Sequence, residues 1–116
     1  MPTKIIISKN FERKAKKFVK KYASLKSEIR ELVVEIRENP TLGVQVFENV
    51  YKIRLACKSK GVGKSKGFRV ISYIKEIDGE EIEVFLTLLS IYDKSETSTL
   101  SQSEIEDIID SLDDEE

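Results

Sequence analysis

A dense group of lysines and arginines lies between residues 52 and 69 of this sequence. No acidic residue interrupts the group, whose members are Lys52, Arg54, Lys58, Lys60, Lys64, Lys66 and Arg69. Like charges this close together repel one another, so we expect a compensating anion, and nucleic-acid phosphates are the obvious one. The pattern therefore indicates a phosphate-binding surface. The alternative is a glycine-rich loop that lysines keep solvated.

Two known motifs overlap this group, in the stretch SKGVGKSKGFRV from Ser59 to Val70. A Walker-type phosphate loop needs a glycine where Lys58 stands, and it needs a helix where a strand-like segment follows. This motif is therefore excluded. The RNA-recognition signature is matched by Lys66, Gly67 and Phe68, but Val70 replaces its second stacking aromatic. An RNA-recognition fold stays a minor alternative.

The sequence contains no histidine and only one cysteine, which limits the chemistry available to it. Histidine acid–base catalysis, a nucleophilic triad and a Cys/His metal cluster are excluded. RNA cleavage by the RNA's own 2′-hydroxyl remains possible, because it needs only a proton acceptor, a proton donor and positive charge at the phosphorane. Crowded lysines can transfer protons, and arginine can clamp phosphate. We predict no metal and no cofactor.

Hydrophobic periodicity predicts an α+β fold, in which a strand and two helices precede three antiparallel strands and a C-terminal helix. Asn10 is the expected N-cap of the first helix, and Ser24 or Ser27 that of the second, which ends before Pro40. The expected segments are strand 4–8, helix 11–22, a second helix up to 39, strands 50–57, 68–77 and 81–92, and helix 101–112.

Strand alternation over residues 50–57 places Lys52 and Arg54 on one face. Arg69 opens the neighbouring strand, and Lys94 follows the end of the third. Because adjacent strand ends can meet at one phosphate, we predict these four residues as the catalytic set. The loop lysines Lys58, Lys60, Lys64 and Lys66 are predicted to bind RNA.

The length of 116 residues predicts one domain, over residues 1–112, followed by an acidic tail over 113–116. Eight acidic residues and no basic ones lie from Glu104 onward, whereas 20 basic and 13 acidic residues precede it. A basic body with an acidic end is common among nucleic-acid binders. The single cysteine and the lack of a signal-peptide core or membrane-length apolar segment predict a cytoplasmic protein.

Three ordered motifs resemble the RelE/ParE superfamily of type II toxins, with the HigB/RelE branch the most similar. They are YKIRLA from Tyr51, SKGVGKSKGFRV from Ser59, and IYDKSE from Ile91. The resemblance extends from the first helix to the end of the chain. It implies a RelE-like toxin neutralised by a cognate antitoxin protein. It further implies cleavage of mRNA in the ribosomal A site, with contacts to rRNA.

The resemblance also implies roles for single residues. One of Lys52 and Arg54 is associated with proton transfer, Arg69 with the transition state, and Lys94 with the phosphate. Leu100 stands where some members have a stacking tyrosine, so Tyr92 or Tyr73 is expected to stack on a base instead. The identity of the general base stays open.

Two alternatives accompany this interpretation. ParE-like members of the same fold inhibit DNA gyrase and are not nucleases, and fold alone does not decide function. A non-catalytic RNA-binding module would show salt-sensitive binding without cleavage. The basic set at Lys52, Arg54, Arg69 and Lys94 favours the nuclease.

Overall fold

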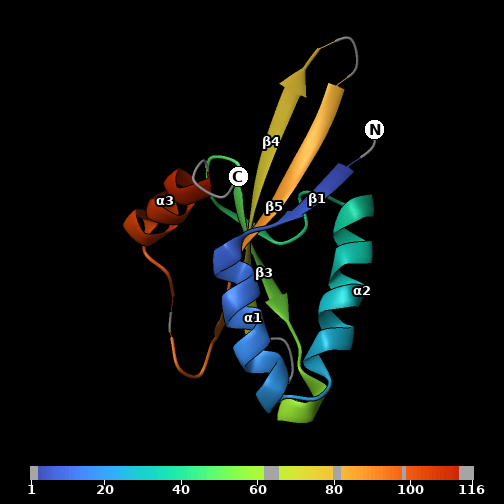
Figure 1. Ribbon diagram of the computed structural model, residues 1–116, viewed down its shortest axis with the longest axis vertical. Coiled ribbons are helices and arrows are strands. Elements are labelled where there is room, and N and C mark those ends of the chain that lie inside the picture. Colours follow the sequence, from blue (N-terminus) through green and yellow to red (C-terminus); the bar gives the residue numbers. More distant parts are fainter. Residues whose placement is uncertain (1–2, 62–65, 80–81, 98, 113–116) are drawn as a thin grey trace.

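The chain folds into an α+β structure (Figure 1). This computed structural model describes residues 3–61, 66–79, 82–97 and 99–112. In chain order the elements are β1 (Thr3–Ile7), α1 (Lys9–Lys21), α2 (Leu25–Glu38), β2 (Val44–Phe47), β3 (Val50–Leu55), the short 3₁₀ helix η1 (Lys58–Lys60), β4 (Phe68–Asp78), β5 (Ile82–Asp93) and α3 (Gln102–Ser111). The predicted class and order of elements are confirmed, with β2 as an additional strand.

The described strands form one sheet in the order β1-β5-β4-β3-β2. β1 is parallel to β5, and the other neighbouring pairs are antiparallel. The long β4–β5 hairpin extends beyond the rest of the sheet at one end (Figure 1). At the other end Leu55, Phe68 and Asp93 lie in register across β3, β4 and β5. The predicted catalytic residues lie at this second end.

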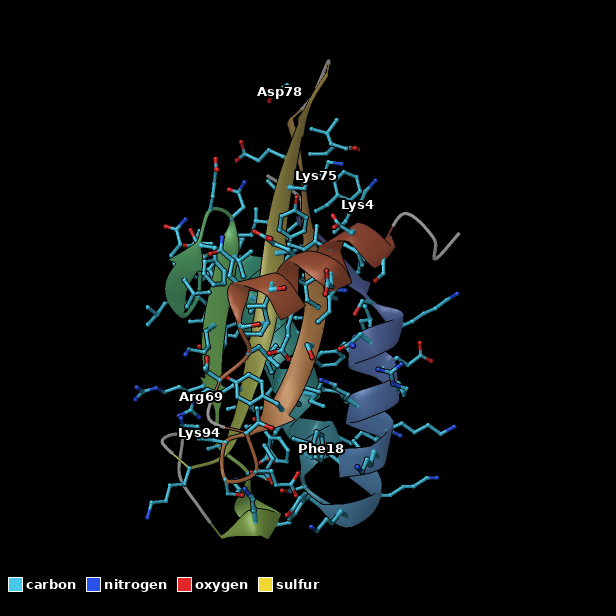
Figure 2. The ribbon with its side chains drawn as sticks, turned by 90° about the vertical axis from the view of Figure 1, so that its left-hand side faces the viewer. Lys4, Phe18, Arg69, Lys75, Asp78 and Lys94 are labelled. Atoms are coloured by element: carbon cyan, nitrogen blue, oxygen red, sulfur yellow. The ribbon has the colours of Figure 1, made fainter. Side chains whose placement is uncertain are left out.

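Helices cover both faces of the sheet. On one face α1 and α2 contribute Phe11, Leu25 and Leu32 to a buried cluster that includes Phe68 and Leu88. The other face packs against α3 through a second buried cluster; Figure 2 shows α3 in front of the sheet and α2 behind it. That cluster contains Val50, Ile71, Leu89, Tyr92 and Ile105. Burial of each large apolar side chain contributes roughly 1.5–3 kcal/mol, so both helix layers stabilise the sheet.

The first helix begins before the expected position. Ser8, not Asn10, is its N-cap, and its Oγ accepts a hydrogen bond from the Phe11 amide at 3.0 Å. The same Oγ donates to the Leu89 carbonyl at 2.8 Å. The prediction of Asn10 was wrong because the choice of Ser8 depends on this contact with β5, which is 81 residues away in the sequence. The cap fixes the start of α1 to the sheet.

The strand β2 was missed because its four residues, at the start of the segment from Val44 to Leu55, are too few to show a period of their own. A turn at Glu48 and Asn49 divides this segment, and Asn49 adopts a positive φ of 63°. Asparagine tolerates that conformation better than most residues with a side chain. β2 then runs back along β3, with Val44 opposite Lys52.

Gly43→Ala is expected to lower the free energy of unfolding by about 2–4 kcal/mol, because overpacking and a positive φ act together. An added Cβ would lie 2.4 Å from the Lys52 carbonyl oxygen and 2.9 Å from Ile53 Cγ1, at a φ of 99°. The matched control is Gly61→Ala, whose φ is 73° but whose Cβ would meet nothing within 4 Å. Urea denaturation should show a larger loss of free energy of unfolding for Gly43→Ala than for Gly61→Ala. Equal losses would contradict the steric account.

Candidate functional site

Arg54, Arg69 and Tyr92 form one row across three strands. Arg54 of β3 lies opposite Arg69 of β4, and Arg69 lies opposite Tyr92 of β5. Residues directly opposite in antiparallel strands share a face, with Cα atoms about 4.5–5.5 Å apart. Lys52 lies two residues from Arg54 on the same face, opposite Ile71. The predicted shared face of Lys52, Arg54 and Arg69 is confirmed, while their roles stay a prediction.

The two arginines of this row differ in exposure. Arg54 is exposed, whereas only 4% of Arg69 is accessible to solvent. The Arg69 Nη1 donates a hydrogen bond to the Phe68 carbonyl at 3.2 Å. Burial, and next the positive charge of Arg54, lower the pKa of Arg69, while Tyr92 opposes this change. The protein therefore keeps two guanidinium groups together in spite of their repulsion, an arrangement that an anion would stabilise.

Lys94 lies beside the same end of β4. Its backbone N–H donates to the Gly67 carbonyl at 3.1 Å, two residues before Arg69. Figure 2 shows Arg69 and Lys94 close together where β4 begins. The side chain of Lys94 is half-buried. The structure thus brings all four predicted catalytic residues to one end of the sheet.

Tyr92 is not presented at the surface. Only 3% of it is exposed, and it belongs to the buried cluster that contains Ile105 of α3. Its hydroxyl has no hydrogen-bond partner among the described residues. A ring covered in this way cannot stack on an RNA base, so the predicted role of Tyr92 is corrected to a core residue in this arrangement. Tyr73 is half-buried against the same cluster.

The predicted RNA-binding lysines separate into three groups. Lys58 and Lys66 are exposed. Lys64 and the tail over 113–116 lie outside the described residues. Lys60 is not exposed to RNA, because its ammonium forms an ion pair with Asp93 and only 11% of its side chain is accessible. The sequence reasoning therefore assigned Lys60 to the wrong environment.

Asp93 is the partner that the sequence reasoning missed. Only 1% of its side chain is exposed, and its Oδ1 accepts hydrogen bonds from Lys60, from the Ser95 amide at 2.9 Å and from the Ser95 hydroxyl at 2.7 Å. The one available signal was the pair of acidic residues, Asp93 and Glu96, on either side of Lys94 in the motif IYDKSE. Burial by itself raises the pKa of Asp93, but the bonds from Lys60 and Ser95 together outweigh it and hold this pKa below its usual value.

This lowered pKa predicts a loss of stability in acid. A carboxyl whose folded-state pKa lies below its unfolded value, about 3.9, contributes stability above that value and loses it as pH falls through the folded pKa. The wild type should therefore exceed Asp93→Asn in free energy of unfolding at pH 7, and the difference should shrink as the pH falls below about 4. Urea denaturation at several pH values measures it. A constant difference would contradict the assigned ionisation.

Lys14 of α1 also reaches the edge of this face. Its Nζ donates to the Ser90 hydroxyl at 3.3 Å, and Ser90 lies opposite Ile71 in the row next to Arg69. Burial, and next the charge of Arg13, lower the pKa of Lys14, while Glu104 of α3 opposes this. Lysines with such a pKa can exchange protons closer to neutrality. Lys14 was not among the site residues predicted from the sequence.

A separate cleft of about 610 Å³ lies between α2 and β3. Arg54 and Lys58 contribute to its lining, but so do the carboxylates of Glu28, Glu31 and Glu35, whereas Lys52, Arg69 and Lys94 do not. Three carboxylates on one wall disfavour a phosphate. The phosphate site indicated by Arg54 and Arg69 is therefore an open surface at the strand ends and does not coincide with this cleft.

In the part of the chain that the structure describes, no helix has the length and apolar character needed to cross a membrane. No group of three or more Cys, Asp or Glu side chains among these residues is arranged to hold a metal ion. No known protein family and no curated protein matches this sequence.

Proposed function

We propose that this protein is the toxin of a type II toxin–antitoxin system and acts in the cytoplasm as a ribosome-dependent mRNA endoribonuclease. The proposal is carried by the cross-strand pair of Arg54 and Arg69. Two like charges in direct opposition destabilise a sheet. A ligand with concentrated negative charge would offset this cost, and the phosphate that becomes a dianionic phosphorane is such a ligand.

In this mechanism the RNA supplies its own nucleophile. The 2′-oxygen attacks the adjacent phosphorus, its proton passes to a basic side chain, and the 5′-oxygen of the next nucleotide leaves with a proton. Arg54 is exposed and binds the phosphate, whereas Arg69, buried directly opposite it, adds positive charge to the site as the phosphorane forms. Lys94 contacts the phosphate, and Lys52 is our candidate for proton transfer.

The basic surface of α1 supports a large RNA partner. The helix carries exposed cations at Arg13, Lys16, Lys17, Lys20 and Lys21, with Glu12 as its acidic residue. None of these five cations forms an ion pair with a described residue. In Figure 2, α1 lies on the other side of the molecule from Arg69. This second basic surface suits contact with rRNA while the strand ends hold mRNA.

The test uses purified protein with ribosomes that carry a short defined mRNA. We expect products with 2′,3′-cyclic phosphate and 5′-hydroxyl ends. A single 2′-deoxy nucleotide at the cleavage position should abolish the cut, because it removes the nucleophile. Cleavage of the 2′-deoxy mRNA at an unchanged rate would refute the 2′-hydroxyl mechanism.

Two other outcomes identify the alternative functions. Intact mRNA together with trapped gyrase–DNA complexes would assign the protein to the ParE-like inhibitors. Salt-sensitive RNA binding without either effect would leave a non-catalytic RNA-binding module.

A further inference from the structure

The buried ion pair of Lys60 and Asp93 joins three separate segments of the chain. Lys60 belongs to η1, in the lysine-rich segment over residues 58–66 that we call the basic loop, and Asp93 is the last residue of β5. The Lys60 ammonium also donates to the Lys66 carbonyl at 3.3 Å and to the Ser95 hydroxyl at 3.1 Å. One ammonium therefore contacts both ends of the basic loop and the turn that follows β5.

Backbone hydrogen bonds show what this pair holds in place. The Asp93 carbonyl accepts from the amides of Glu96 and Thr97, at 3.1 and 2.9 Å, which closes the turn that carries Lys94. The Lys94 amide in turn bonds to Gly67 at 3.1 Å. The turn after β5 and the segment before β4 are thus bound side by side, and each leads to a predicted catalytic residue.

The ion pair acts from the face of the sheet opposite to Arg69. The Lys60 ammonium lies 5.5 Å from the ring centre of Phe68 and 6.0 Å from that of Tyr22. Phe68 belongs to the core under α1 and α2, and successive residues of a strand point to opposite faces. Arg69 therefore points away from Lys60. The pair can position the phosphate site but does not touch a phosphate bound there.

We propose that Asp93, through its ion pair with Lys60, is a positioning residue that holds the Lys94 turn against the start of β4. The inference rests on the proposed nuclease function. Without the pair, the backbone around Lys94 and Gly67 loses the charge-assisted bonds that join it to η1. Displacement of a catalytic group by about 1 Å can slow a reaction by up to about 10²-fold.

The test compares Asp93→Asn with Glu83→Gln. Both changes remove one negative charge and one ion pair from β5, because Glu83 pairs with Lys4 at 3.4 Å, where both side chains are exposed. For Asp93→Asn we expect kcat for mRNA cleavage to fall by about tenfold or more with KM little changed. Glu83→Gln should leave both constants unchanged. The loss of one negative charge by itself would strengthen RNA binding, so a fall in kcat that is seen only in Asp93→Asn is not a charge effect.

Amide hydrogen exchange gives a second measurement that does not depend on activity. The Lys94 amide should exchange faster in Asp93→Asn and at the wild-type rate in Glu83→Gln. Unchanged exchange at Lys94 in a folded Asp93→Asn protein would overturn the positioning role, as would faster exchange with full kcat. An inactive wild type would instead refute the proposed nuclease, and exchange at Lys94 would then decide the positioning of the turn by itself.

Ser95→Ala provides a milder variant in case Asp93→Asn does not fold. It removes the hydroxyl that bonds to both Asp93 and Lys60 and leaves the ion pair in place. A smaller change in the same direction, in kcat and in Lys94 exchange, supports the proposal. Wild-type values for both would contradict the part of the proposal that assigns the Ser95 hydroxyl bonds a role in holding this turn.

Discussion

Arg69→Ala is expected to lower kcat for mRNA cleavage by about 10²–10³-fold, the usual effect of removing one donor from a preorganised charge-stabilising site. Arg69 is buried and its Nη1 donates to the Phe68 carbonyl, so its positive charge is held at one place in the site. Arg54→Ala should have a smaller effect, because Arg54 is exposed and more mobile. Single-turnover cleavage on programmed ribosomes measures both.

The fold should survive the loss of this charge. Arg69→Met keeps the aliphatic volume of the side chain and removes the guanidinium, so we expect a folded protein that does not cleave mRNA, with its fold checked by circular dichroism and urea denaturation. Arg37→Ala, which removes an exposed arginine in the last turn of α2, is the control that should cleave normally. Full cleavage by Arg69→Met would refute the assigned site.

Reversal of charge on α1 is expected to give a different defect. Lys16→Glu combined with Lys20→Glu should weaken binding to ribosomes by about 10–100-fold at physiological salt and lower the salt dependence of log K by about 2. Lysines four residues apart lie about 6 Å apart along a helix, so they can contact successive phosphates. We expect KM to rise while kcat at saturation is unchanged, because these side chains do not reach Arg69.

The control for α1 is the same change of charge on α2. Lys26→Glu with Arg30→Glu alters the net charge equally, but on a helix where Glu31 and Glu35 already balance the cations. These residues should therefore contribute little to ribosome binding. Equal loss of binding in both double variants would show that total charge matters and that the α1 surface does not.

The elements of this fold follow from local patterns in the sequence. The spacing of Phe11, Ala15 and Phe18 is sufficient to place α1 against a core, and alternation in β3 places Lys52 and Arg54 together. These features depend on residues a few positions apart, where helix and strand periods are decisive. The register that puts Arg54 opposite Arg69 does not follow from these patterns, because residues 56–67 separate β3 from β4 and a connection of that length does not fix the pairing.

The environment of single side chains was less predictable. The exposure of Tyr92 depends on α3, which packs over the same face of the sheet. The sequence of β5, the strand that contains Tyr92, does not indicate this contact. Lys60 has the same local sequence character as Lys58, yet a contact with Asp93, 33 residues away, buries one and leaves the other in solvent. Such pairings depend on tertiary packing, which periodicity does not encode.

The most direct test of the nuclease site is mRNA cleavage in a translating extract with wild type, Arg69→Met and Arg37→Ala. The account predicts codon-spaced cuts with wild type and Arg37→Ala and intact mRNA with Arg69→Met. Intact mRNA with all three proteins, or equal cleavage by all three, would contradict the assignment of a catalytic phosphate site to Arg69.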